Sequence, residues 1–244
     1  MNWIEFKDRC SRFLWFDKKE VLNVVILVLV FAFIFSFNMW GVDSFNAFEG
    51  FNNLVIAFVL VAVVVLLHHF VQRIMAILFG YEPVHKTWWP GLILSLLFVV
   101  FSNGNLMFYI GSVFNVKMRE YQRIGWQRYG LNVKQQGLIA VFGNVAVLLL
   151  IGVLKLFTVV PDSFLYRMIS FSIVFVFFNM IPWPHSDGLL MMLGSRLYFA
   201  FLAGFLIGFF VFLSSGFLMA AFLGLLTGII AWFVFYWFFE RKWT

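Results

Sequence analysis

The sequence predicts an all-α protein that crosses a membrane several times. Of its 244 residues, 64% are hydrophobic and only 11% are charged, and the mean hydropathy is +0.98. A typical soluble domain is about 45–50% apolar and about 25% charged, and a soluble domain of this size could not bury so much apolar surface. The apolar residues also gather in runs of roughly 20, the length at which a helix crosses the hydrocarbon core of a bilayer. These observations exclude an ordinary soluble protein, a nucleic-acid-binding domain and a disordered chain.

Six apolar runs predict transmembrane helices, and a seventh run is short. The six runs are residues 21–40, 54–78, 137–160, 164–181, 197–213 and 217–239. The short run, 88–101, is followed by Ser-Asn-Gly-Asn, a sequence that favours a turn. We therefore expect about six transmembrane helices plus one segment of a different kind.

The distribution of Lys and Arg predicts the orientation of the helices. Residues 1–20 and 117–136 each contain five basic side chains, whereas residues 41–53 contain none. Because basic loops stay on the cytoplasmic side, we expect a multi-pass protein of the cell membrane with both termini in the cytoplasm. Both ends of residues 88–116 then face the cytoplasm, so this stretch is predicted to be re-entrant. Irregular backbone at membrane depth must be covered by protein or line a wet cavity, which makes this stretch a pointer to function.

The chain is predicted to have three parts. Residues 1–20 form a basic, aromatic-rich cytoplasmic flank, which is either an amphipathic helix lying on the membrane or a charged segment with aromatic anchors. Residues 21–196 form the membrane core. Residues 197–244 form a C-terminal hairpin of two transmembrane helices. Small residues in this hairpin allow close helix packing: Ala203, Gly204 and Gly208.

Two polar clusters interrupt the apolar runs. Residues 68–73 (His-His-Phe-Val-Gln-Arg) lie in the cytoplasmic half of the second predicted span, and residues 179–188 (Asn-Met-Ile-Pro-Trp-Pro-His-Ser-Asp-Gly) lie at the cytoplasmic end of the fourth. Ionisable groups inside spans are costly and are therefore candidates for function. Because both clusters are predicted on the same side of the membrane, they could meet in space.

The first cluster resembles the metal-binding helix of the site-2 proteases, a family of intramembrane zinc metalloproteases with a His-Glu-x-x-His motif. The family often places Ala and Gly at four-residue steps after the second His, and Ala76 and Gly80 stand at those steps. This register puts His68 at the first zinc ligand, His69 at the general-base Glu and Gln72 at the second ligand.

The second cluster resembles the family's Asn-x-x-Pro-x-x-x-Asp-Gly motif, which supplies the third zinc ligand. Its members stand in the expected order: Asn179, Pro182, Pro184, Asp187 and Gly188. In addition, Gly143 resembles the glycine of the family's Ala-Gly-Pro helix, and residues 111–113 resemble its membrane-embedded loop. The resemblance covers about residues 50–196, and it implies a site-2-protease-like core in which Asp187 is a metal ligand.

Two catalytic positions depart from the family pattern. Histidines at i and i+4 share one helix face and can bind one zinc ion, and the Glu acts as base on the zinc-bound water. Here the amide oxygen of Gln72 is a poor zinc ligand, and the imidazole of His69 is larger than a Glu and directed differently. Glu82 is the nearest candidate for a replacement base, and His85 is expected to be solvated in a cytoplasmic loop.

Three interpretations of the cluster stay open. In the first, its residues are remnants that hydrogen-bond across the helices and hold no metal. In the second, zinc is bound by a rebuilt set of His68, His185 and Asp187, with Gln72 as a weak fourth ligand. In the third, the cluster handles protons or ions. We use the distance between the His68 ring nitrogens and the Asp187 carboxylate as a criterion: within about 4–5 Å, metal-type geometry survives, since zinc bonds are near 2.0–2.2 Å.

These interpretations correspond to three functions. We expect a catalytically inactive homologue of the family that binds a transmembrane helix or another membrane protein and uses no cofactor, with His69 non-functional at the base position. The first alternative is an active, divergent intramembrane metalloprotease with zinc. The second is a small transporter or channel component. The surrounding partner is the lipid bilayer, nucleic acid is excluded, and the sequence specifies no oligomeric state.

Overall fold

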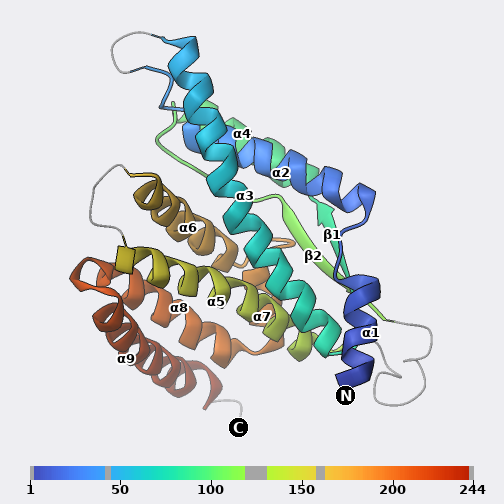
Figure 1. Ribbon diagram of the computed structural model, residues 1–244. Coiled ribbons are helices and arrows are strands. Elements are labelled where there is room, and N and C mark those ends of the chain that lie inside the picture. The colour runs from blue at the N-terminus through green and yellow to red at the C-terminus, as the bar shows by residue number, and fades with distance from the viewer. Residues whose placement is uncertain (1–2, 42–44, 119–130, 158–162, 242–244) are drawn as a thin grey trace.

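The protein is mostly helical, as the sequence predicts (Figure 1). The computed structural model describes residues 3–41, 45–118, 131–157 and 163–241. The predicted cytoplasmic basic residues at 119–130 and the chain at 158–162, where the third predicted span ends, lie outside the described residues.

Each of the six predicted spans coincides with a helix. Within the described residues, four helices are long and apolar enough to cross a membrane: α2 (Lys18–Ser36), α3 (Ala47–Leu78), α5 (Val133–Phe157) and α9 (Phe217–Phe235), which a π-helical turn extends over Tyr236–Glu240. Three apolar helices are shorter: α4 (Trp89–Phe101), α6 (Phe164–Met180) and α8 (Arg196–Val211). The remaining helices are α1 (Trp3–Phe13) and α7 (Asp187–Gly194), with a 3₁₀ turn at Leu213–Ser215.

Helix α3 is the longest helix among the described residues and carries His68, His69 and Gln72 of the candidate site. Its 32 residues correspond to about 48 Å at 1.5 Å per residue, and it begins seven residues earlier than the predicted span. Figure 1 shows it crossing the molecule toward α1. It ends in a Schellman motif, in which Tyr81 N–H donates to Ala76 O and Gly80 has a φ of 87°. A glycine is therefore needed at position 80 to turn the chain out of the helix.

A two-stranded antiparallel sheet departs from the predicted all-α fold. Strand β1 (Glu82–Thr87) pairs with β2 (Ser112–Lys117), with Thr87 opposite Ser112. The strands are six residues long and distant from each other in sequence, and β1 has no alternating apolar pattern. The local sequence therefore does not predict the sheet.

The segment between the two strands leaves the sheet as α4 and returns as extended chain. Trp88 N–H donates to Gly111 O, and the Ser95 hydroxyl bonds the carbonyl oxygen of Ile110, so the returning chain lies along α4. The segment therefore begins and ends at the same end of the two-stranded sheet. The chain thus runs out and back, and re-entry of residues 88–116 into the membrane stays a prediction.

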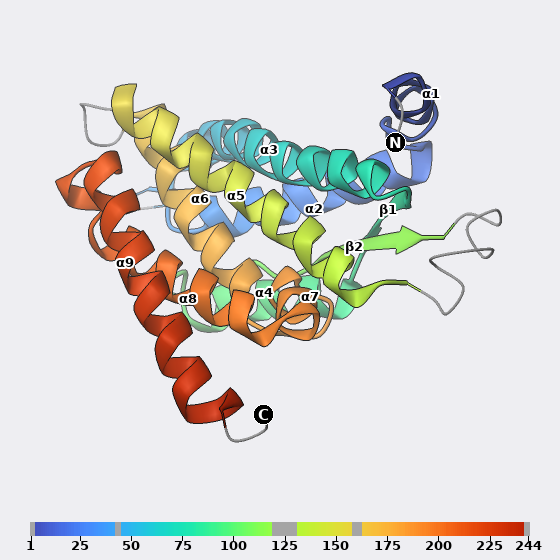
Figure 2. The ribbon, with the colours of Figure 1, turned by 90° about the horizontal axis from the view of Figure 1, so that it is seen from below.

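The other helices pack around α3 and α5. Helix α5 contacts α3, α6 and α7, whereas α8 and α9 form a hairpin at the side of the molecule (Figure 2). A Cβ atom at Gly204 would lie 2.8 Å from the Thr227 carbonyl oxygen, and one at Gly208 would overlap the Thr227 side chain. The predicted close packing at these two glycines is therefore confirmed.

Candidate functional site

The two predicted polar clusters meet between α3, α5 and α7. Asp187 is the first residue of α7, placed there by the N-cap Ser186, whose hydroxyl accepts from Leu189 N–H. His68 and Gln72 lie one turn apart on the same face of α3. His68, Gln72 and Asp187 are all buried. The second cluster thus reaches the first from across the bundle, as the sequence suggested.

One carboxylate oxygen is the centre of this arrangement. Asp187 Oδ2 accepts hydrogen bonds from Gln72 Nε2 at 2.8 Å and from Asn144 Nδ2 at 3.2 Å. His68 Nε2 lies 3.0 Å from the same oxygen but is not aligned for a hydrogen bond, so we treat it as a close electrostatic contact. The distance satisfies the criterion set from the sequence, and the carboxylate is already engaged by two amides.

His69 is held in a chain of hydrogen bonds rather than aimed at Asp187. Its Nδ1 lies 3.1 Å from Gln72 Oε1, and its Nε2 lies 2.9 Å from the Ser112 hydroxyl. Because the Gln72 amide nitrogen donates to Asp187, the amide oxygen is the group left to face His69. We infer that His69 carries its proton on Nδ1 and accepts from Ser112 on Nε2, an assignment that rests on the network.

Gly143 allows α5 to approach α3 at the centre. A Cβ atom at this position would lie 2.7 Å from Gln72 Cγ and 2.9 Å from His68 Nε2. Its neighbour Asn144 then reaches Asp187, a role that the sequence analysis missed. The signal available was an amide side chain within an otherwise apolar run, next to a glycine.

The other residues of the second motif shape the connection between α6 and α7. A Cβ atom at Gly188 would overlap the Met180 carbonyl oxygen, so only glycine fits beside the end of α6. Pro182 and Pro184 are exposed in the intervening turn. Asn179 is half-buried at the end of α6, and its amide nitrogen has no hydrogen-bond partner among the described residues.

His185 is exposed instead of joining His68 and Asp187. Its backbone has a φ of 68°, and its ring packs against Trp88 at a centroid distance of 5.3 Å. Across the described ranges, no three His, Cys, Asp or Glu side chains form a group that could hold a metal. The rebuilt set of His68, His185 and Asp187 is therefore not assembled in this conformation.

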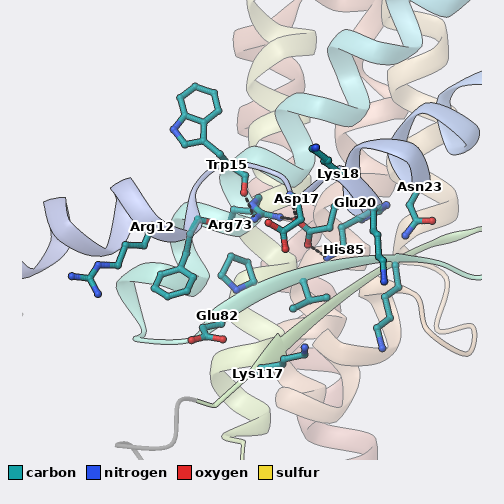
Figure 3. A pocket seen from close by; sticks show the side chains of 15 residues that line it. Arg12, Trp15, Asp17, Lys18, Glu20, Asn23, Arg73, Glu82, His85 and Lys117 are labelled. Atoms are coloured by element: carbon teal, nitrogen blue, oxygen red, sulfur yellow. Dashed lines mark hydrogen bonds and ion pairs between the residues drawn. The ribbon is translucent and has the colours of Figure 1, made fainter.

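His85 corrects a second expectation. The sequence predicts a solvated loop at this position, but the His85 ring is buried and lies 4.4 Å from the His69 ring, centroid to centroid. Strand alternation explains this, because Pro83 and His85 share the buried face of β1. Burial lowers the pKa of His85 to about 4, an effect that nearby Glu20 opposes. Glu82, the candidate replacement base, points away to line a pocket near the N-terminus (Figure 3).

Zinc does not fit the donors as they are arranged. A catalytic zinc site uses three protein ligands, and here one imidazole and one carboxylate face each other. The third place is occupied by the Gln72 amide nitrogen, which is a hydrogen-bond donor with no lone pair to offer a metal. The arrangement instead joins three helices through one shared acceptor.

The chain matches no protein-family model, no curated protein and no solved structure. The resemblance to site-2 proteases therefore depends on the motif residues themselves and on their meeting in the fold.

Proposed function

We propose that this chain is a polytopic membrane protein with site-2 protease architecture that no longer cleaves peptide bonds and instead binds a transmembrane helix or another membrane protein. The observation that supports it most strongly is the hydrogen bond from Gln72 Nε2 to Asp187 Oδ2. It replaces a metal–ligand contact with an amide donor at the position where the family would place its second zinc ligand.

The arrangement of these residues supplies neither of the two groups that zinc-dependent peptide hydrolysis needs. Peptide hydrolysis at a zinc centre needs a metal that acidifies water and a base that takes the proton. His69, at the base position, is buried and bonded on one ring nitrogen to Gln72 and on the other to Ser112. No lone pair of His69 is left to accept a proton from a water molecule.

What the centre does instead is to join helices. Gln72 on α3 and Asn144 on α5 both donate to Asp187 at the start of α7, so one carboxylate connects three elements. Hydrogen bonds to a charged acceptor contribute about 1.5–3 kcal/mol each. The Asp187 cluster thus holds the three helices together. The function that we propose for the protein is therefore the binding of a partner and not catalysis.

The exposed face of α3 is the surface that we propose for the partner. Apolar side chains recur along it at the three- and four-residue steps by which helices pack together: Val55, Val59, Val63, Leu66 and Phe70. This face lies on the side of α3 opposite to His68 and Gln72, so a helix lying on it would pack against α3 without contacting the Asp187 centre.

Two experiments test the proposal, a photo-cross-linking experiment that looks for the partner and a cleavage assay that looks for peptidase activity. A photo-reactive residue at Val63 is expected to cross-link one membrane protein, identified by mass spectrometry, whereas the same probe at Ile229 on the exposed side of α9 should not. Purified full-length protein is expected to leave a membrane-helix substrate intact. Cleavage of that substrate, lost in Asp187→Ala, would overturn the proposal.

The second candidate is the active, divergent metalloprotease. The observation in its favour is that both His68 ring nitrogens lack hydrogen-bond partners in the described part of the chain, while Nε2 lies 3.0 Å from Asp187 Oδ2. A buried imidazole in that state retains a lone pair that a metal could use if Gln72 moved away. This candidate requires stoichiometric zinc in elemental analysis and its loss in Asp187→Ala.

A further inference from the structure

An open pocket of about 740 Å³ lies between the N-terminal segment, the start of α2 and the sheet (Figure 3). Cationic side chains dominate its lining: Arg12, Lys18, Lys19, Arg73, Lys86 and Lys117. They outnumber three carboxylates, those of Asp17, Glu20 and Glu82. The pocket is therefore suited to an anion.

Hydrogen bonds of Arg73 and Glu20 hold the elements that line this pocket in place. The Arg73 guanidinium, on α3, donates to Glu20 Oε2 at 3.0 Å and to the carbonyl oxygens of Phe13, Leu14 and Trp15 at 2.8–3.1 Å. The other Glu20 oxygen accepts from His85 N–H at 2.8 Å, which ties β1 to the start of α2. Arg73 and Glu20 thus neutralise each other and position the walls, so the excess charge belongs to the lysines.

The four lysines of the lining, Lys117 included, are exposed. Lys18, Lys19 and Lys86 form no ion pair with any described residue. By contrast, Arg12 pairs with Asp8. Lys18 and Lys19 occupy the first turn of α2, where the helix dipole disfavours positive charge. Their position works against the helix, which indicates that they serve something other than its stability.

Apolar surface continues directly from the cationic pocket. Val21, Leu22 and Val25 on α2 are 48%, 61% and 39% exposed, within two turns of the lysines. Trp15, beside the pocket, is 74% exposed, and tryptophan is enriched at the level of lipid headgroups. A bound molecule with an anionic head and an apolar tail would satisfy both surfaces at once.

We propose that this pocket binds a phosphate-bearing anion through Lys18, Lys19 and Lys86, and that the adjoining apolar surface selects the headgroup of an anionic membrane lipid over a soluble phosphate. The inference does not depend on the proposed function, because Lys18, Lys19 and Lys86 take no part in the hydrogen bonds to Asp187. It assigns a lipid class to the cytoplasm-facing basic flank predicted from the sequence.

The test compares two triple variants of the full-length protein in detergent. The pocket variant is Lys18→Gln, Lys19→Gln and Lys86→Gln, and the control, with the same loss of charge outside the pocket, is Lys7→Gln, Lys134→Gln and Lys155→Gln. Binding of phosphatidylglycerol and of phosphatidylcholine is measured by native mass spectrometry. Because each basic side chain near an anionic headgroup contributes about 1 kcal/mol, we expect about a hundredfold weaker phosphatidylglycerol binding in the pocket variant.

Inorganic phosphate and glycerol 3-phosphate serve as soluble competitors. If the lipid is the ligand, neither displaces phosphatidylglycerol, phosphatidylcholine binds weakly, and the control variant binds like the unmodified protein. Displacement by either soluble phosphate would overturn the assignment to a lipid. Equal losses in the two triple variants would overturn the site itself. Thermal unfolding without lipid checks folding, and the pocket variant is expected to be at least as stable as the unmodified protein because it removes cations from the first turn of α2.

Discussion

Gln72 and Arg73 are neighbours on α3 but belong to two buried polar clusters of different character. Arg73 belongs to a cluster with Glu20, in which the guanidinium donates to the carboxylate and to three carbonyl oxygens and lies 4.4 Å from the centroid of the Phe16 ring. Both Glu20 oxygens also accept backbone N–H bonds, from Asp17 and His85. Every nitrogen of the Arg73 guanidinium and both oxygens of Glu20 therefore have at least one partner, and in that sense this cluster is fully paired.

The cluster around Asp187 is only partly paired. Gln72 and Asn144 donate to its carboxylate, yet both ring nitrogens of His68 and the amide oxygen of Asn144 have no hydrogen-bond partners within the described ranges. Unpaired buried polar groups cost free energy. The Arg73 cluster is therefore arranged for stability. The Asp187 cluster, by contrast, keeps unpaired groups on His68 and Asn144 whose presence stability alone does not explain.

Replacing Arg73 is expected to have the largest effect, because it breaks the fully paired cluster. Arg73→Met leaves Glu20 buried without its cation, which should lower the free energy of unfolding by about 3–5 kcal/mol. The measurement is unfolding in mixed micelles. Arg167→Met is the matched control, since among the described residues that guanidinium makes one hydrogen bond, to Asn53, and its loss should cost much less. Equal losses would contradict the stabilising role of the Arg73–Glu20 pair.

Adding a methyl group at Gly143 tests how closely the helices pack around the Asp187 cluster. Gly143→Ala would push a Cβ atom against Gln72 and His68, and overpacking of this kind costs about 1–3 kcal/mol. Alanine has the higher helix propensity, so an unfolding free energy above that of the unmodified protein would contradict the close approach of α5 to α3.

His85 lies between the two clusters and predicts an acid-sensitive stability. Because burial lowers its folded pKa to about 4, it stays neutral in the folded protein between pH 6.5 and 4 while the unfolded chain binds a proton. Stability should therefore fall with decreasing pH, by about 2 kcal/mol between pH 7 and pH 5 from this residue. His85→Phe is expected to remove that component, which unfolding curves at the two pH values measure. An unchanged pH dependence would contradict the buried, neutral state.

The smallest effect is expected from Asp187→Asn. The variant keeps the shape of the side chain and an oxygen that can accept from both Gln72 and Asn144 but removes the negative charge, so the loss should be about 1–2 kcal/mol. A loss as large as that of Arg73→Met would mean that the Asp187 cluster is as fully committed to stability as its neighbour. Unfolding in mixed micelles again provides the measurement.

The helices and the meeting of the two clusters could be predicted from the sequence. Long apolar runs specify helices in lipid, and the basic loops placed residues 68–73 and 179–188 on one side. The sheet could not be predicted, because Glu82–Thr87 carries no period-2 apolar pattern and its partner strand is remote. The burial of His85 was missed for the same reason, since only strand pairing turns that side chain inward.

The direction of the Gln72 amide was also beyond the sequence. The sequence placed Gln72 at the position of a zinc ligand in the family that it resembles, but the pairing of its nitrogen with Asp187 and of its oxygen with His69 depends on where α7 and β2 bring their side chains. The motif glycines, in contrast, were found by pattern, and the structure supplies their reasons: Gly80 ends α3, and Gly188 passes the Met180 carbonyl oxygen.

Metal content tests the central claim most directly, namely that a zinc-protease framework here has an amide donor in place of a ligand. Purified protein is compared with the double variant His69→Glu and Gln72→His, which restores the His-Glu-x-x-His pattern on α3. We expect no bound zinc in the unmodified protein and one zinc ion per chain in the double variant, lost when Asp187→Ala is added. Stoichiometric zinc in the unmodified protein, lost in Asp187→Ala alone, would contradict the account.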